Sequence, residues 1–172
     1  VPWATGSRQG PVVWKMGIHS SAGGAPRVSV IIPTYAGSRH LKPCLAALLD
    51  QSRPADEILV IDDASPPPTD SEFLSREFPG QPALRVLRNP ANLGFAGAVN
   101  RGLAEATGSL IALLNNDTRP DRHWLERALA PFADPRVGAV ATRLVRMDRP
   151  EILDSAGDGY TVAGGTLKFR SG

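Results

Sequence analysis

Residues 109–117 read SLIALLNND, a short apolar run that stops abruptly on two amides and a carboxylate. Apolar runs of this length, bounded by turn-forming residues, are typical of strands that are buried on both faces. Strands of that kind belong to parallel sheets whose two faces are covered by helices. An ordinary turn does not require the polar cluster at residues 115–117, so its role has to be sought in the rest of the chain.

The composition fits one globular domain without a covalent or metal staple. The chain has 172 residues, of which 42% are hydrophobic and 21% charged, enough for a single core. Cys44 is the one cysteine, so no internal disulfide is possible. The formal charge of +2 comes from scattered arginines and not from a basic stripe, so we expect no nucleic-acid partner.

No apolar run reaches 18 residues, and the first residues lack the pattern of a signal peptide. We therefore expect a soluble cytoplasmic protein. Peripheral association with the inner membrane surface is the alternative location.

Apolar runs and helical patterns alternate from residue 28 onward. Strands are expected at residues 28–32, 57–61, 84–88, 109–114 and 137–144, and helices at residues 38–51, 69–78, 94–108 and 121–132. In the first helix, one face is apolar at i, i+3, i+4, i+7 and i+8, comprising Leu41, Cys44, Leu45, Leu48 and Leu49. The alternation predicts an α/β fold with a mostly parallel, Rossmann-like sheet flanked by helices on both faces.

The two ends of the chain are predicted to differ from this alternating part. Residues 1–27 are rich in Gly, Ser and Pro and contain Trp3 and Trp14, which indicates a linker or an N-terminal arm that docks through its tryptophans. Residues 28–172 would form the domain itself. The pattern weakens beyond Val145 and no closing element is evident before Gly172, so we expect a fragment truncated at its C-terminal side.

Polar clusters follow four of the predicted strands. They read PTY at residues 33–35, DDAS at 62–65, NPANLG at 89–94 and NND at 115–117. One such cluster is an ordinary cap or turn, since Asp, Asn and Ser are favoured there. Because ligands of open parallel sheets bind outside the carboxyl ends of the strands, four clusters at one edge predict a crevice suited to a nucleotide diphosphate.

The segments VSVIIPTY, ILVIDDAS, NLGFAGAVNRG and LLNND, in this order and at these separations, resemble a family 2 glycosyltransferase. The resemblance covers about residues 28–145 and implies the GT-A nucleotide-sugar fold. LLNND and NLGFA are similar to a branch with rhamnosyltransferase-like and galactofuranosyltransferase-like enzymes. The implied activity is inverting transfer of a hexosyl or deoxyhexosyl group from a UDP- or dTDP-sugar to a saccharide or lipid-linked acceptor.

The resemblance also implies how the nucleoside is held. Pro33 and Tyr35 match the family's base-binding turn. The alternative is a purely structural turn proline beside a half-buried tyrosine. Asp63 matches the carboxylate that accepts the imide N–H of the base, a donor that suits an aspartate acceptor. Asp62 is expected to orient the loop instead.

The segment before the third helix matches the family's phosphate side. Asn92 and Gly94 lead into a helix whose N-terminal N–H groups and dipole would favour a nearby phosphate. Plain helix capping is the alternative for Asn92. Asn100 matches an amide of the same motif, or it bridges helix and strand.

LLNND occupies the place of the family's DXD motif, which holds a divalent cation against the two phosphates. Asp117 would then be the metal ligand, with Mg²⁺ or Mn²⁺ completing its shell from phosphate and water. Asn116 is placed to bond the ribose and Asn115 to hold the loop. The alternative is an Asn-rich cap before the next helix.

The catalytic base is not identified in this sequence. Inverting transfer needs a carboxylate that deprotonates the acceptor hydroxyl, and in the family it lies well beyond the last matched motif. The alternative function is therefore a non-catalytic nucleotide-sugar-binding domain. A nucleotidyltransferase is disfavoured because no Gly-rich triphosphate loop follows the first strand, and a dinucleotide oxidoreductase because no GxGxxG stands there.

Overall fold

A computed structural model describes residues 12–15, 26–36, 38–69, 71–155, 158–160 and 166–168. The chain divides into two units, Val12–Val140 and the combination of Val1–Pro11 with Ala141–Gly172, and each is described by itself. Trp3 lies outside the described residues. Within the described part of the chain, no helix has the length and apolar character needed to cross a membrane.

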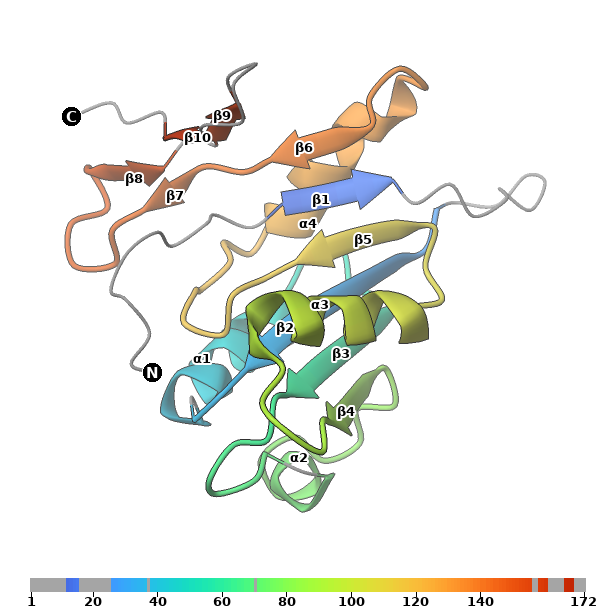
Figure 1. Ribbon diagram of the computed structural model, residues 1–172. Coiled ribbons are helices and arrows are strands. Elements are labelled where there is room, and N and C mark those ends of the chain that lie inside the picture. Colours follow the sequence, from blue (N-terminus) through green and yellow to red (C-terminus); the bar gives the residue numbers. More distant parts are fainter. Residues whose placement is uncertain are drawn as a thin grey trace. The chain divides into compact units, whose positions relative to one another are not determined.

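The larger unit alternates strands and helices in the predicted order. Its strands are β1 (Val12–Lys15), β2 (Val28–Thr34), β3 (Glu57–Asp62), β4 (Leu84–Arg88), β5 (Leu110–Leu113) and β6 (Ala139–Ala141). Its helices are α1 (Ser38–Leu49), α2 (Ser71–Glu77), α3 (Gly94–Glu105) and α4 (Trp124–Leu129), the last followed by the 3-10 turn η1 (Ala130–Ala133). The predicted alternation from β2 to α4 is therefore confirmed (Figure 1).

The strand order is β4-β3-β2-β5-β1-β6. β2 pairs in parallel with β3 and with β5, and β3 pairs in parallel with β4. The chain thus builds one side of the sheet with β3 and β4 and then returns to the other side of β2 with β5. Beside β5 lies the antiparallel strand β1, formed by residues 12–15 that the sequence assigned to the arm.

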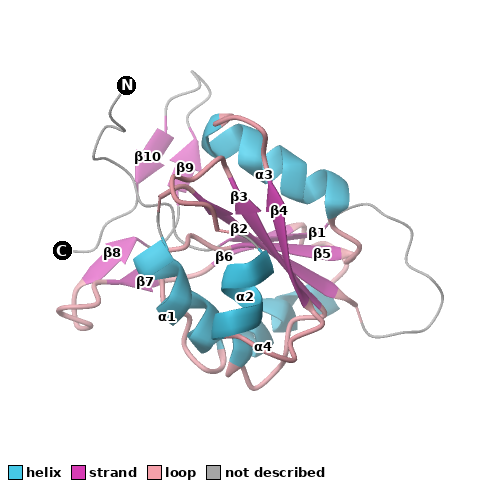
Figure 2. Ribbon diagram, turned by 90° about the horizontal axis from the view of Figure 1, so that it is seen from below, coloured by secondary structure: helices cyan, strands magenta, loops and turns pink. Residues whose placement is uncertain are grey.

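Helices cover both faces of the sheet, as the sequence predicts (Figure 2). On one face, α1, α2 and α4 pack against alternate residues of the strands, in a core that includes Val30, Ile32, Val60, Leu45, Leu74 and Leu125. On the other face, α3 packs through Ala98 against a smaller cluster that includes Ile31, Leu59, Ile61 and Ile111. Because strand side chains alternate between faces, consecutive residues at a strand end also point to opposite faces.

Several predicted elements are shorter than the sequence indicated, and two of them differ from the prediction in kind as well. The helix expected at residues 121–132 ends at Leu129, because Pro131 has no N–H to donate and the chain tightens into η1. The prediction of a single strand at residues 137–144 is wrong. The segment contains β6 and the start of β7 (Leu144–Val145), and β7 pairs with β8 (Leu153–Ser155) in a separate two-stranded sheet.

The smaller unit contains the antiparallel pair of β7 and β8 and a second antiparallel pair. β9 (Asp158–Tyr160) pairs with β10 (Thr166–Lys168). The sequence predicted neither pair, because strands of two or three residues give almost no periodic signal.

A buried acid ties the amino ends of the strands together. Glu57, at the start of β3, accepts hydrogen bonds from the Ser29 hydroxyl at 2.6 Å and from the Thr107 amide at 2.9 Å. Arg85 on β4 donates to its other oxygen. Burial raises the pKa of Glu57, but the hydrogen bonds from Ser29 and Thr107 and the charge of Arg85 together lower it below its usual value. The carboxylate therefore stays ionised and fixes the turn that leads into β5.

Gly102 permits the close approach of α3 to the sheet. A Cβ at this position would lie 2.5 Å from Cγ2 of the fully buried Ile31. We expect Gly102→Ala to lower the unfolding free energy by about 1 kcal/mol, because overpacking costs about 1–3 kcal/mol and better helix propensity returns roughly 1 kcal/mol. Urea denaturation measures the change.

The matched control is Gly138→Ala. A Cβ there meets nothing within 4 Å, so the change should stay within about 0.5 kcal/mol. A Gly102→Ala protein with a higher urea midpoint than the parent would contradict this packing of α3 on Ile31.

Candidate nucleotide-binding site

The predicted site residues gather at the carboxyl edge of the parallel strands, toward which the arrowheads of β2, β3 and β5 point (Figure 1). The loops after β2, β3, β4 and β5 meet there through hydrogen bonds between different loops. β2 lies between β3 and β5, so this edge includes the point where the strand order reverses. Open α/β sheets bind ligands at such a point.

Asp63 is buried and joins the end of β3 to the start of α3. Its Oδ1 accepts from the Asn89 side-chain amide at 2.8 Å and from the Leu93 N–H at 2.9 Å. Its Oδ2 accepts from the Gly94 N–H at 2.9 Å. A carboxylate has about four acceptor positions, so Oδ2 retains capacity for one more donor. Asp63 therefore caps α3 and can still accept a hydrogen bond from a ligand.

Asp62 organises the loop on the opposite face, as the sequence predicts. The carboxylate accepts from the Ser65 N–H at 3.1 Å and from the Thr69 N–H at 3.2 Å. It also pairs with Arg88, which lies directly opposite it on β4. Asp62 is fully buried, and these three partners offset the cost of burying its charge.

The turn after β2 presents the predicted aromatic ring. Pro33 pairs with Ile61 inside the sheet, and Tyr35 follows β2 with 43% of its surface exposed. On one side of Tyr35, the Thr34 carbonyl accepts from the Asp63 N–H at 2.9 Å. On the other side, Ala36 donates its N–H to the Ser65 hydroxyl at 3.0 Å. The backbone on both sides of Tyr35 is thus bonded to the loop after β3, and its side chain is not buried in the core.

Asn92 and Gly94 form the entry to α3. The Asn92 side-chain oxygen accepts from the Gly94 N–H at 3.0 Å, which is the capping interaction named as its alternative role. Gly94 has φ +74°, a left-handed conformation that a residue with a Cβ rarely adopts. Two N–H groups at this helix start already donate to Asp63, so a phosphate here would have to use other groups. Asn100 lies exposed on α3.

The loop after β5 lies over α1 and beside β2. Asn116 donates its side-chain amide to the Thr34 hydroxyl at 2.7 Å, and the Asn115 carbonyl accepts from the Thr118 hydroxyl at 2.7 Å. Burial raises the pKa of the Cys44 thiol to about 12, a hydrogen bond with Thr118 opposes the rise, and the negative charge of Asp117 adds to it. The thiol stays neutral, and Asp117 is close enough to influence it.

Four residues of this edge were not assigned a ligand role from the sequence, although each stands in a quoted cluster or directly before one. They are Thr34, Ser65, Arg88 and Asn89. Asn89 is 2% exposed, and an amide placed directly after a predicted strand was the available signal. Their partners come from other strands, which the local sequence does not reveal.

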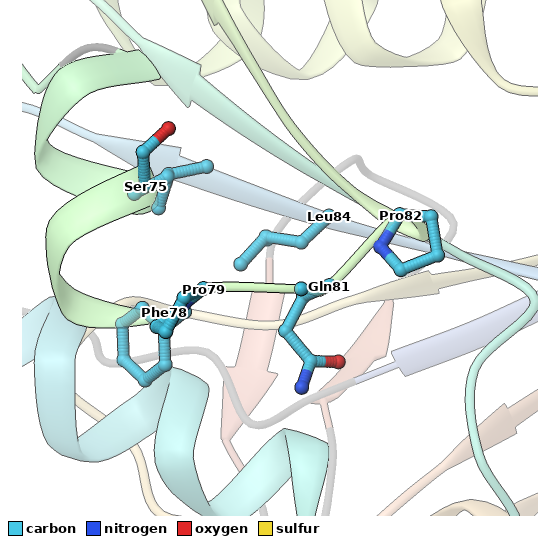
Figure 3. Close-up of a pocket in the computed structure, with 8 residues that line it drawn as sticks. Ser75, Phe78, Pro79, Gln81, Pro82 and Leu84 are labelled. Carbon is cyan, nitrogen blue, oxygen red and sulfur yellow. The ribbon is translucent and has the colours of Figure 1, made fainter.

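A hollow of about 490 Å³ lies elsewhere, between the end of α2 and the start of β4 (Figure 3). Its lining includes Leu74, Phe78, Gln81, Pro82 and Leu84. Leu84 is the amino end of β4, whereas the site residues lie at the carboxyl ends. The hollow is therefore separate from the predicted crevice.

Residues 29–156 match the model of the family described as Glycosyl transferase family 2. The chain belongs to this family. The matched range contains all four polar strand ends and extends beyond the region of resemblance seen in the sequence.

A relative and two solved structures illustrate the match. The pre-mycofactocin glycosyltransferase of Mycobacterium tuberculosis is 35% identical over 121 residues, which are 70% of this chain and 24% of the relative. The mannosyltransferase PcManGT from Pyrobaculum calidifontis, solved with GDP-Man and Mn²⁺, is 30% identical with a TM-score of 0.62 and is matched over 77% of this chain and 39% of that one. Staphylococcus aureus TarS 1–349, solved with UDP, is 27% identical with a TM-score of 0.53 over 63% and 32%.

These similarities establish the GT-A fold for this chain. The chain spans only about a quarter to two-fifths of the length of these proteins.

The double role of Asp63 gives a prediction for Asp63→Asn. Asparagine keeps the shape but replaces one acceptor oxygen by an N–H donor, which then faces backbone N–H donors. Because hydrogen bonds to charged groups contribute about 1.5–3 kcal/mol, amide exchange at Leu93 and Gly94 should accelerate by about 10- to 100-fold in a protein that stays folded. Exchange measured by NMR tests this. Asn92→Ala is the control: it removes the Asn92 bond to Gly94 but leaves the Asp63 bond to Leu93, so the protection of the Leu93 amide should not change. Unchanged protection in Asp63→Asn would show that another group caps α3.

Proposed function

We propose that this chain is the donor-binding part of an inverting glycosyltransferase that takes a sugar from a UDP- or dTDP-sugar. We further propose that the enzyme transfers a hexosyl or deoxyhexosyl group to a saccharide or lipid-linked acceptor. The observation that carries it is the hydrogen-bonded assembly of four strand ends around Asp63, Tyr35 and Asn116. Family membership and the nucleotide-sugar complexes of the structural neighbours support it.

The base contacts follow from chemistry already described. Asp63 can accept one further donor at Oδ2, and the ring N3–H of uracil or thymine is such a donor. Tyr35, exposed on the adjoining turn, provides an aromatic face on which the base can stack. Pro33 shapes the same turn. Adenine has no ring N–H on its pairing edge, so Asp63 disfavours adenine nucleotides.

The diphosphate side is assigned to the loop after β5 and the entry to α3. Asn116 is held by Thr34 through its amide nitrogen, which leaves its carbonyl oxygen to accept from a ribose hydroxyl. Asn92 and Gly94 shape the backbone that faces the phosphates. Each of these residues binds or orients the donor, and the acceptor-side base is left unassigned.

The residues present fit a divalent metal whose shell the donor completes. Asp117 offers a hard carboxylate oxygen in the loop after β5, and Mg²⁺ in proteins often uses one or two carboxylates together with phosphate oxygens. Among the described residues, no three His, Cys, Asp or Glu side chains lie close enough to hold an ion by themselves. When bound, Mg²⁺ or Mn²⁺ would neutralise charge on the leaving diphosphate. Asp117 would hold the ion against it.

The base assignment predicts a nucleotide preference. UDP or dTDP should bind the chain more tightly than ADP or NAD in calorimetric titrations, and GDP belongs in the same series because guanine also carries a ring N–H. Asp63→Ala should weaken UDP binding by about 1–3 kcal/mol through the lost acceptor. Equal or tighter binding of ADP or GDP would contradict the pyrimidine assignment.

The metal assignment predicts cooperative binding. With Asp117 as the carboxylate of the motif, Mn²⁺ should bind poorly alone and well with UDP, and linkage makes the effect reciprocal. Asp117→Asn should therefore abolish the increase in UDP affinity that Mn²⁺ causes and leave uridine binding unchanged. UDP titrations with Mn²⁺ and with chelator, for both proteins, measure this.

Asp121→Asn is a matched control, because Asp121 is exposed and pairs with Arg127 on α4. A wild-type chain without a metal effect, or an Asp117→Asn chain that keeps the whole effect, would assign Asp117 to capping alone.

A further inference from the structure

A side-chain hydroxyl joins the turn after β2 to the loop after β3, in addition to the backbone bond from the Asp63 N–H to the Thr34 carbonyl. The Ser65 Oγ accepts from the Ala36 N–H at 3.0 Å. Ser65 is 2% exposed, while Tyr35, the neighbour of Ala36, is 43% exposed. The contact therefore connects a buried anchor to the turn that presents an aromatic ring to solvent.

Ser65 is itself fixed through its backbone. Its N–H donates to Asp62 at 3.1 Å. Its carbonyl accepts from both Nη1 and Nη2 of Arg88 at 3.2 Å each, and Arg88 also pairs with Asp62. Because Asp62 and Arg88 bond both the N–H and the carbonyl of Ser65, the Ser65 hydroxyl is fixed within hydrogen-bonding distance of the Ala36 N–H.

Two alanines beside this contact have left-handed backbone. Ala36 has φ 49° and Ala64 has φ 62°. A residue with a Cβ adopts this region at a cost in free energy, so it keeps the conformation only where neighbouring groups hold it. The Ser65 hydroxyl bonds the Ala36 N–H, and Ala64 directly precedes Ser65 in the chain.

We propose that Ser65 is a positioning residue for the donor base. Its hydroxyl keeps Ala36 left-handed, so that Tyr35 stays turned toward the position of the base while the same loop presents Asp63. The proposal rests on the proposed function, because Tyr35 and Asp63 are its base contacts. A strained turn that keeps an aromatic ring out of the core is what a preorganised stacking surface requires.

The test compares the binding of ligands that contain the base with the binding of pyrophosphate alone. Ser65→Ala should weaken the binding of UDP and of uridine by about 3- to 10-fold, because it removes one hydrogen bond that holds the turn in its binding conformation. Pyrophosphate with Mn²⁺ should bind within about 2-fold of wild type, because the loop after β5 is untouched. A residue that only stabilises the fold would change both ligands together or neither.

Rescue provides the second measurement. Glycine adopts left-handed backbone without penalty, so Ala36→Gly added to Ser65→Ala should return UDP affinity to within about 2-fold of wild type. Ser109→Ala is the matched control, since Ser109 bonds the Arg27 carbonyl at the opposite end of the strands. If Ser65→Ala does not fold, Arg88→Lys serves instead: it keeps a cation beside Asp62 but loses the two-pronged bond to Ser65, and should weaken uridine but not pyrophosphate.

The outcomes distinguish the two proposals. A wild-type chain that binds no UDP overturns the proposed function and this inference with it. A wild-type chain that binds UDP while Ser65→Ala binds it equally well overturns the positioning role alone. Parallel loss of pyrophosphate binding, or failure of Ala36→Gly to restore UDP affinity, overturns it as well.

Discussion

Two adjacent buried carboxylates at the end of β3 hold the functional edge of this domain together. Asp62 and Asp63 point to opposite faces because successive strand residues alternate. Asp62 folds the loop that follows β3 and pairs with Arg88, whereas Asp63 receives the amides that open α3. Each charge is compensated by hydrogen bonds, which is the condition for burying it. Removing this pair would release the loops after β2, β3 and β4 together.

The same pair connects stability to recognition. Asp63 accepts hydrogen bonds from the Asn89 side chain and from the backbone N–H groups of Leu93 and Gly94, so the group proposed to bind the base also sets the start of α3. Asp62 is connected to the proposed base site indirectly: it bonds Ser65, and Ser65 bonds Ala36 in the turn that carries Tyr35. The parallel strands beneath are buried, and hydrogen bonds join their loops in the structure without a ligand. Preorganisation of this kind reduces the ordering cost of binding.

Much of this architecture could be predicted from single segments. The apolar runs at residues 28–32 and 57–61 correspond to β2 and β3, because buried parallel strands give a nearly continuous apolar sequence. The segment LRVLR at residues 84–88 corresponds to β4, a partly exposed strand at the edge of the sheet. The alternating order then placed their polar ends at one edge. The capping bond of Asn92 was also foreseeable, since asparagine bonds its own backbone two residues on. β1 was missed because its four residues gain their strand conformation from β5, nearly a hundred positions away in sequence.

The sequence by itself determined which residues stand at the strand ends, their charges and the family to which they belong. Tertiary structure decided how they are used: Asp63 faces α3, Asp62 faces Arg88, Asn116 reaches Thr34, and Ser65 reaches Ala36. The physical reason is that strand and helix patterns are local, governed by backbone sterics and side-chain periodicity. Hydrogen-bond partners across the sheet depend instead on strand order and register, and these are fixed only when the whole core packs.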